Sequence, residues 1–396
     1  MTDSDVQPRS SPAQIKGWCP GAWQPMAASD GLVVRVRPPG GRLSQAQAYG
    51  VAELAQRCAS SWLELTNRAN LQLRGVDAAG HALLLDGLRE LDLLDRDAAA
   101  EARRNVQVQP LWTEGDTTQT LALHLGEWLA RADAPALPPK FGFTVDTGAV
   151  PCLRGAYADI RLERHAQGVL VYADGAAAGG VFAPEEAPAQ ALALARWFLA
   201  AGGAPEGRGR MAALLTRCDL PAAWQQVPVP AAVGKALEPG PQPGGTLVGL
   251  AFGLMQVGTL AALADGGALR LTPWRSVYVE GEAPLPKFSE LITDKNDARL
   301  RIAACTGAPH CQQAWAPTRD LALALAPLVP SGQMLHVSGC AKGCAHPKMA
   351  TTVVATPRGY DFIRHGTAAC APDHRGLALL ALELLLKNKT FHAPRL

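Results

Sequence analysis

The sequence reads Ala303-Ala-Cys-Thr-Gly-Ala-Pro-His-Cys311 and, a little further on, Ser338-Gly-Cys-Ala-Lys-Gly-Cys344. The first stretch separates two cysteines by five residues and the second separates two by three. Four thiolates from two loops are the ligand set of a cubane iron–sulfur cluster. Glycine and alanine beside the ligands leave room for backbone N–H groups to approach the sulfur atoms. The pattern therefore favours an iron–sulfur protein.

Two other uses of the four cysteines remain open from spacing alone. Structural zinc also takes four cysteines, although its loops usually place the paired cysteines closer together. Disulfide bonds would require an oxidising compartment, and nothing else in the sequence indicates one. The chain has nine cysteines, an odd number, and the paired ones sit at ligand spacing, which fits a reducing cytoplasm.

Composition limits the class of protein. A chain of 396 residues with 48% hydrophobic residues can form two or three domains with real cores. The formal net charge of +2 excludes a bulk electrostatic role in binding nucleic acid. An anionic ligand would have to be held by a local cluster of arginines.

No targeting or membrane segment is predicted. The polar start of the chain, with Asp3 and Asp5, is not a signal peptide, and residues 1–18 are expected to be a flexible tail. The uncharged stretch 245–264 is long enough to span a membrane. Its counterpart in the repeat described below carries several charges, so we expect a strand followed by a helix.

Polar and apolar residues alternate from Leu63 to Arg74. A period of two predicts one strand with an apolar face and a polar face. The polar positions are Glu64, Thr66, Arg68, Asn70, Gln72 and Arg74. A solvated face would show the same alternation. The density of Arg, Asn and Gln also fits the floor of a ligand site, and both interpretations stay open.

The chain repeats itself at a constant offset. Leu269-Arg-Leu-Thr272 and Val277–Gly281 align without a gap with Leu63-Glu-Leu-Thr66 and Leu71–Gly75, so the faces of the strands are preserved. We further expect Lys140-Phe-Gly142 to occupy the place that Cys340–Cys344 holds in the second copy. The predicted parts are a tail (1–18), a first ferredoxin-like half-domain (19–76), a first repeat without a cluster (77–200), a linker (201–244), a second half-domain (245–285) and a second repeat with the cluster (286–396).

The duplicated α+β chain, the arginine-bearing strand, the Lys-Phe element and the cysteine pattern together resemble the sulfite and nitrite reductase haemoprotein family. The resemblance implies two halves related by a pseudo-two-fold axis, with mixed sheets flanked by helices. It also implies that Cys305, Cys311, Cys340 and Cys344 bind a 4Fe-4S cluster. The other cysteines are expected to be small buried or surface residues, not ligands: Cys19, Cys58, Cys152, Cys218 and Cys370.

Site residues follow from the same resemblance. Thr66-Asn-Arg68, Arg104-Asn-Val106 and Lys140 match elements that surround a tetrapyrrole and its anion in the family. Arg68, Arg104 and Lys140 are therefore the predicted catalytic residues, and the same three with Asn70, Gln72 and Arg270 are predicted to bind substrate. Gly142 departs from the sulfite reductases, which carry a second lysine at this position. Arg35, Arg37 and Arg74 are expected to face solvent or the other half.

The opening Cys19-Pro-Gly21 and the stretch Arg270-Leu-Thr-Pro-Trp-Arg275 are similar to one branch of the family, which serves aerobic cobalamin synthesis. This resemblance implies a cytoplasmic monooxygenase that hydroxylates precorrin-3A at C20 with dioxygen and closes a lactone. It implies a mononuclear non-haem iron in place of sirohaem, although no His/carboxylate facial triad stands out. NADH is the expected ultimate electron donor. A partner reductase is also expected, because no dinucleotide fingerprint is found.

Two alternatives of a different kind remain. A sirohaem-dependent sulfite or nitrite reductase would share the fold and the cluster. A non-catalytic iron–sulfur carrier of tetrapyrroles would bind the macrocycle without changing it. Both would keep the cysteine pattern, so the sequence leaves the choice to experiment.

Overall fold

A computed structural model describes residues 19–231 and 234–387. The predicted tail, 1–18, lies outside the described residues. Over the described part, one compact unit contains residues 19–27 and 31–295, and a smaller unit contains residues 28–30 and 296–387.

Two interlocked sheets form the first layer of the larger unit. Each sheet borrows a strand from the other half of the chain: β14 pairs with β4, and β3 pairs with β15. The first sheet has the order β1 (Met26–Ala28), β2 (Gly31–Val36), β5 (Leu71–Val76), β4 (Trp62–Leu65), β14 (Leu254–Gln256). The second has the order β12 (Gly240–Gln242), β13 (Gly245–Leu250), β16 (Ser276–Glu280), β15 (Leu269–Leu271), β3 (Arg42–Leu43), with β17 (Leu291–Ile292) against β13.

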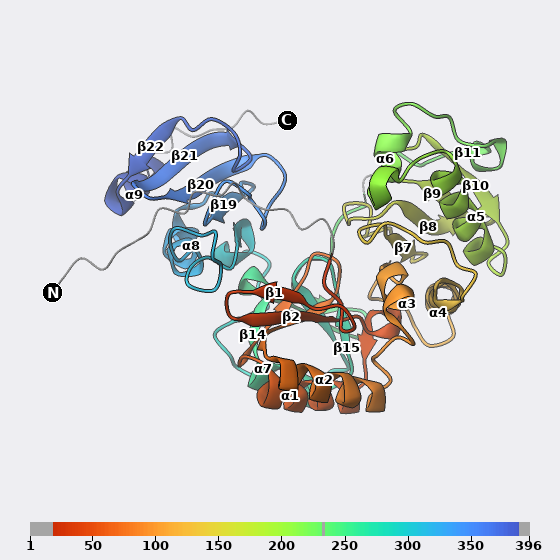
Figure 1. Cartoon of the computed structure of the whole chain (residues 1–396), viewed down its shortest axis with the longest axis horizontal. Coiled ribbons are helices and arrows are strands. Elements are labelled where there is room, and N and C mark those ends of the chain that lie inside the picture. The colour runs from red at the N-terminus through yellow and green to blue at the C-terminus, as the bar shows by residue number, and fades with distance from the viewer. Residues whose placement is uncertain (1–18, 232–233, 388–396) are drawn as a thin grey trace. The chain divides into compact units, whose positions relative to one another are not determined.

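Three helices pack on these sheets: α1 (Gln45–Cys58), α2 (Ala78–Glu90) and α7 (Val257–Gly266), and they lie on one side of them (Figure 1). The expected N-cap of α1 is confirmed, because Ser44 and Gln47 form a reciprocal capping box. The stretch 245–264 is a strand followed by a helix, as predicted. No helix within the described residues is long and apolar enough to cross a membrane.

A third sheet completes the larger unit. Its order is β11 (Val227–Pro228), β10 (Ala178–Phe182), β9 (Gly168–Ala173), β8 (Ile160–His165), β7 (Phe143–Asp146), β6 (Val106–Val108). Four helices belong to this part: α3 (Ala98–Arg103), α4 (Thr117–Ala130), α5 (Ala187–Ala200) and α6 (Met211–Leu214). The expected linker 201–244 is not a bare connection, because it contributes α6, β11 and β12 and buries Met211 and Trp224 in this core.

The smaller unit is built on a fourth sheet, β18 (Ile302–Ala304), β19 (Leu335–Ser338), β20 (Ala350–Thr356), β21 (Gly359–Gly366), β22 (His374–Leu377), with α8 (Arg319–Leu325) and α9 (Leu379–Lys387). Two parallel pairings are followed by two antiparallel ones. The strands β6 to β10 pair in the same order and directions. The predicted duplication is therefore present in both pairs of half-structures.

Strand order corrects one detail of the repeat. Val108 pairs with Val145 in the first copy, as Ala304 pairs with Val337 in the second. Counting from these pairs, the first-copy counterparts of the four cysteines are Gln109, Gly115, Gly148 and Cys152. Lys140-Phe-Gly142 precedes β7, at the opposite end of that strand, so the expectation that it replaces Cys340–Cys344 was wrong. Motif order along the chain had matched it to the wrong strand.

The alternating stretch 63–74 is two strands, not one. β4 and β5 form a hairpin in which Leu65 pairs with Leu71. The hydroxyl of Thr66 accepts hydrogen bonds from the N–H groups of Arg68 and Asn70, at 3.3 and 3.2 Å. Ala69 takes a positive φ of 54°. The turn therefore places Arg68 at the tip of the hairpin.

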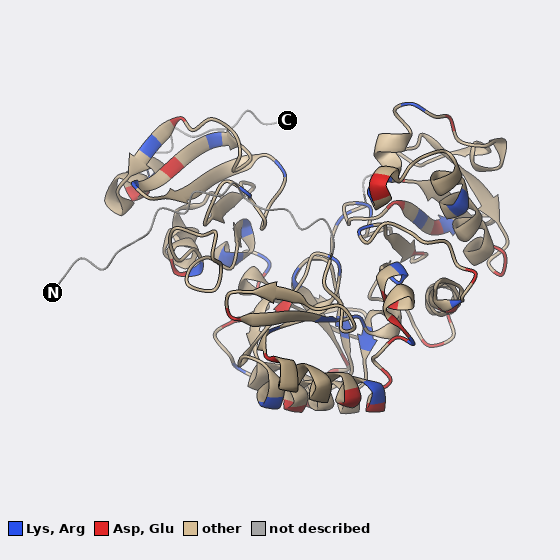
Figure 2. Ribbon diagram, in the orientation of Figure 1, with Lys and Arg blue, Asp and Glu red and all other residues tan. Residues whose placement is uncertain are grey.

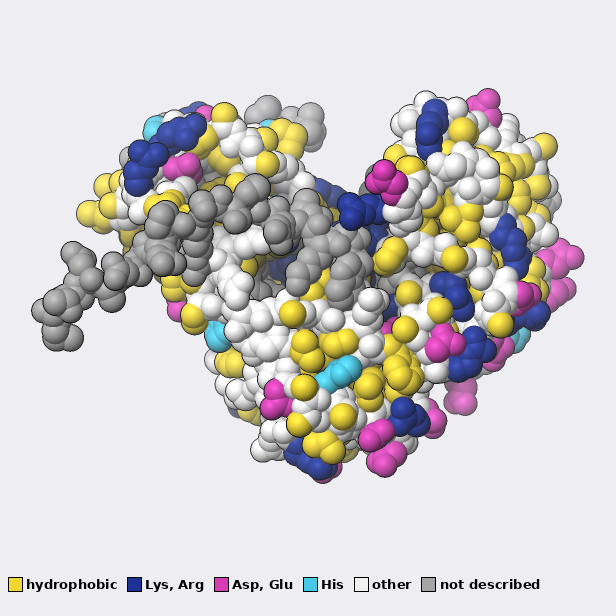
Figure 3. Space-filling view, in the orientation of Figure 1, with side chains coloured by type: hydrophobic (Ala, Val, Ile, Leu, Met, Phe, Trp, Pro, Cys, Tyr) yellow, Lys and Arg dark blue, Asp and Glu magenta, His cyan; other side chains and the backbone are white. Residues whose placement is uncertain are grey.

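Charge is spread over the outer elements. Acidic and basic residues are interspersed along the helices of the half-domain layer (Figure 2). The face in view carries both signs intermixed (Figure 3). This distribution agrees with the net charge of +2.

Candidate active site

The four predicted cluster ligands lie in two loops of the smaller unit. Cys305 directly follows β18 and Cys340 follows the neighbouring parallel strand β19, so both loops leave the same edge of the sheet. The N–H of Gly339 donates to Cys305 Sγ at 3.2 Å. Cys344 interacts electrostatically with the other three thiols, Cys305, Cys340 and Cys311. The structure thus brings the four cysteines into one neighbourhood.

Sulfur chemistry and electrostatics fit a cluster at this edge. Burial raises the pKa of the Cys340 thiol, and the nearby Cys311 and Cys305 raise it further. Thiolates crowded in this way are stabilised by a cationic metal centre. Among the residues described, no three His, Cys, Asp or Glu side chains converge closely enough for a single metal ion. A four-iron cluster has a different requirement, because each thiolate binds its own iron atom.

The first-copy counterpart of this edge holds no such set. Cys152 is buried, and its N–H and that of Leu153 donate to Asp146 Oδ2, both at 2.7 Å. The Cys152 thiol lies 3.8 Å from Asp146 Oδ1. Arg154 of this loop donates to Glu163 on β8, which also accepts from Tyr172 on β9. Side-chain hydrogen bonds therefore hold the loop that a cluster would hold in the second copy.

A pH dependence follows from Asp146. Burial raises the pKa of its carboxyl from 3.8 to about 6. This difference corresponds to about 3 kcal/mol by which the folded state favours the protonated carboxyl over the ionised one. The folded state therefore binds a proton more readily than the unfolded state, and this contribution to stability is lost as the pH rises from about 4 to about 6. Over this range, we expect the stability of the wild type to fall relative to that of Asp146→Asn. Thermal unfolding of both proteins at several pH values measures it, and parallel curves would contradict it.

Arg68 lies in a basic site of the larger unit. Its guanidinium carbon is 5.8 Å from the centre of the Tyr157 ring. Its Nη1 is buried and has no hydrogen-bond partner among the described residues. Burial lowers the pKa of Arg68, and nearby Arg210 and Arg35 lower it further. A buried guanidinium with an unused N–H donor can bind an anion.

Asp159 holds the Lys140 loop beside this guanidinium. The buried carboxylate accepts hydrogen bonds from Arg210 Nε at 2.9 Å and from the N–H groups of Met211 and Gly142 at 2.9 and 3.0 Å. Arg210 also donates to the carbonyl of Lys140 at 3.2 Å. Lys140 is half-buried.

The polar face of the hairpin is buried, which favours the ligand-floor interpretation over a solvated face. Glu64, Asn70 and Gln72 are each less than a tenth exposed. Gln72 donates to Glu64 and accepts from Arg35 Nε at 2.9 Å. Arg35 therefore joins this site, contrary to the expectation that it meets solvent or the other half. Three guanidinium groups (Arg35, Arg68, Arg210) accompany two carboxylates (Glu64, Asp159) among the described residues.

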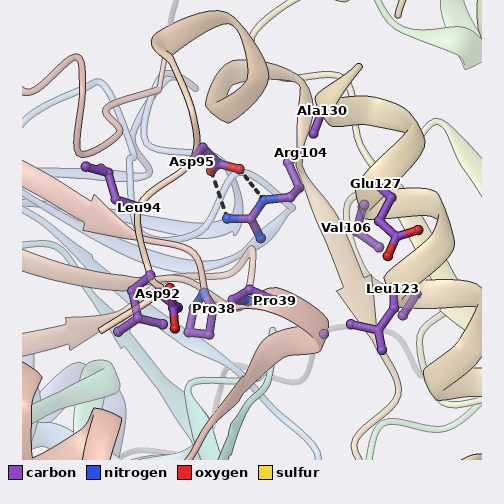
Figure 4. Close-up of a pocket in the computed structure, with 14 residues that line it drawn as sticks. Pro38, Pro39, Asp92, Leu94, Asp95, Arg104, Val106, Leu123, Glu127 and Ala130 are labelled. Carbon is purple, nitrogen blue, oxygen red and sulfur yellow. Dashed lines mark hydrogen bonds and ion pairs between the residues drawn. The ribbon is translucent and has the colours of Figure 1, made fainter. Parts of the chain in front are cut away.

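Arg104 and Arg270 have protein partners of their own. Arg104 donates to both oxygens of Asp95, at 2.7 and 2.8 Å, in a pocket of about 320 Å³ walled by Pro38, Leu94 and Leu123 (Figure 4). Substrate would have to displace Asp95 to take both bonds.

Arg270 is 8% exposed and bonds Glu280 Oε1 at 2.6 Å and the carbonyls of Pro110 and Trp112. Its guanidinium carbon lies 3.7 Å from the centre of the Trp112 ring. This geometry ties the second half-domain to the segment after β6. Its substrate role thus stays a prediction that the geometry does not favour.

Sequence reasoning missed Arg210, Asp159 and Tyr157. Arg210 lies in the stretch taken for a linker, and Tyr157 and Asp159 lie between the loop after β7 and the start of β8. The pair Arg208-Gly-Arg210, two arginines in a stretch rich in Gly and Pro, was the one available signal.

Comparison with known proteins places the fold and the relatives. Residues 24–91 match the family described as nitrite/sulfite reductase ferredoxin-like half domain. The structure of the Mycobacterium tuberculosis NirA protein superposes with a TM-score of 0.57 at 17% identity, covering 84% of this chain and 73% of that one. The chain thus has the sulfite/nitrite reductase-like α+β fold. A protein of Sinorhizobium sp named precorrin-3B synthase is 30% identical over 402 residues, covering 90% of this chain and 84% of the relative. On this similarity, the chain belongs to the precorrin-3B synthase family.

Proposed function

We propose that this protein is a precorrin-3B synthase. In this reaction, precorrin-3A is hydroxylated at C20 and the ring A acetate closes a lactone, which prepares the macrocycle for ring contraction in aerobic cobalamin synthesis. The proposal is supported by the relative of that name, which aligns over 90% of the chain. The structural observation that carries it is the surplus of buried positive charge around Arg68.

The basic site suits a macrocycle rimmed with carboxylates. The three guanidinium groups of this site outnumber its two carboxylates, and burial makes an unmatched guanidinium costly unless an anion binds it. A guanidinium fork pairs with a carboxylate through two parallel hydrogen bonds. Arg68 would bind one substrate carboxylate in this way and the amine of Lys140 another. Asp159 and Arg210 would keep the Lys140 loop in place while the macrocycle is oriented.

Cys305, Cys311, Cys340 and Cys344 would hold a 4Fe-4S cluster, which supplies one-electron transfer when it is bound. One oxygen atom of dioxygen would enter the substrate, and the other would be reduced to water. Two electrons come from NADH through a separate reductase. The residues of this chain contribute binding, orientation and exclusion of water around the macrocycle.

A labelled turnover experiment tests the proposal. Protein purified without oxygen is mixed with precorrin-3A, NADH, a ferredoxin reductase system and oxygen-18 gas, and the product mass is measured. We expect one labelled oxygen atom in the tetrapyrrole. Unchanged precorrin-3A in the presence of an intact cluster would overturn the proposal and favour a carrier. Sulfide production from sulfite by the same preparation would favour a reductase.

A further inference from the structure

Gly142 lies where its missing side chain makes room for Arg68. A Cβ atom at position 142 would be 3.5 Å from Arg68 Nη1 and 3.4 Å from the carbonyl oxygens of Asn105 and Tyr157. One methyl group therefore fits at ordinary contact distance. A longer side chain would crowd these three groups, of which the Arg68 side chain is the most easily displaced because the other two belong to the backbone.

The backbone at Gly142 has little freedom to move away. Its N–H donates to the buried Asp159 carboxylate at 3.0 Å. Its carbonyl accepts from the N–H groups of Asp159 and Ile160, at 2.7 and 3.2 Å. Phe141, next to it, is fully buried in the core. A larger residue at 142 would thus displace the Arg68 side chain, because the loop is fixed on both sides.

Arg68 has a hydrogen-bond donor that the described part of the protein does not use and that a ligand could bind. Its Nη1 donates to no described residue, although two carbonyl groups border the Gly142 position. The Tyr157 ring supports the guanidinium from one side. The donor is buried and oriented, which is the arrangement that makes a charge-assisted hydrogen bond strong.

We propose that Gly142 is a specificity-determining residue. Because it has no side chain, the Arg68 guanidinium can lie against the Lys140 loop, where it binds a carboxylate of the tetrapyrrole. This pairing of Gly142 with Arg68 forms the binding site for the carboxylate. The inference rests on the proposed function for the class of ligand. A residue without a side chain thus takes part in substrate selection, because the size of residue 142 decides whether the Arg68 guanidinium can reach the substrate.

A double-mutant cycle tests the pairing. The probe is uroporphyrin, a tetrapyrrole octacarboxylate, titrated anaerobically against the whole protein by fluorescence quenching. Arg68→Met and Gly142→Leu should each weaken binding about ten- to a hundredfold, the range of one charge-assisted hydrogen bond. The double variant should bind no more weakly than either single variant, since both act on one contact. Gly142→Ala should bind nearly as the wild type does, and so should Arg164→Met, a substitution of an exposed arginine on β8.

Three results would overturn the pairing: wild-type affinity in Gly142→Leu, losses that multiply in the double variant, or no binding of uroporphyrin by the wild type. Melting temperatures check that each variant is folded, and Gly142→Thr replaces Gly142→Leu if the latter is not. Uroporphyrin is not turned over in this assay. Binding that depends on Arg68 without oxidation of precorrin-3A would therefore refute the proposed function and leave the pairing intact.

Discussion

Cys344→Ser is expected to abolish the brown iron–sulfur absorption and all turnover of precorrin-3A. The thiol of Cys344 interacts with the other three cysteines of the two loops, so its loss would leave a cluster with three thiolate ligands. Serine is a poor replacement, because the thiolate is the metal ligand and an alcohol is not ionised at neutral pH. The measurement is the visible absorption spectrum together with the ratio of iron to protein after anaerobic purification.

Cys152→Ser is the matched control for this change. Cys152 has the same position after β7 that Cys344 has after β19, yet it is buried and hydrogen-bonded within the first copy. The variant should keep full iron content and colour. Cys218→Ser, at the edge of the core that packs on the third sheet, should do so too. A colourless Cys152 variant, or a brown Cys344 variant with full iron content, would show that the assigned ligand set is wrong.

How far the site could be predicted depends on how local its signals are. The four predicted cluster ligands lie in two short loops, so the spacing of Cys305, Cys311, Cys340 and Cys344 is visible in the sequence. The repeat is visible because two strands keep one offset. Arg68 stays a predicted site residue, and the strand that was expected to carry it is a hairpin. No glycine or proline marks that turn; a threonine hydroxyl and a positive φ at Ala69 form it.

The parts of the site that the sequence did not predict depend on contacts between residues far apart in the chain. Arg210 reaches Asp159, which lies far back in the chain, and together they fix a loop that begins at Lys140. Nothing in the local sequence of either residue indicates the other. Arg104 and Arg270 show the opposite case. Either arginine could bind a substrate carboxylate, but each already pairs with a carboxylate of the protein, Asp95 and Glu280 respectively. Residue type alone does not separate a substrate ligand from a structural ion pair.

Asp159→Ala is expected to lower the free energy of unfolding by about 1–3 kcal/mol, the cost of leaving buried hydrogen-bond donors without their acceptor. The carboxylate is 1% exposed and accepts from Arg210, Met211 and Gly142. Without it, one guanidinium and two backbone N–H groups lose their acceptor. The loop that carries Lys140 and Gly142 then loses its anchor, so binding of uroporphyrin should weaken as well. Chemical denaturation and the porphyrin titration measure the two effects.

The surface pair Arg131–Asp133 supplies the control. It has comparable geometry, with Arg131 Nε 2.9 Å from Asp133 Oδ1, but both side chains are more than half exposed. Exposed pairs are screened by solvent and contribute little, so Asp133→Ala should leave both stability and porphyrin affinity nearly unchanged. Asp159→Asn separates charge from shape, because it keeps an acceptor oxygen for Arg210 and Met211 but turns an NH2 group toward the N–H of Gly142. If Asp159→Ala unfolded like Asp133→Ala, the carboxylate would not be the anchor of the Lys140 loop. If Asp159→Asn kept wild-type stability, hydrogen bonding would hold the loop without the negative charge.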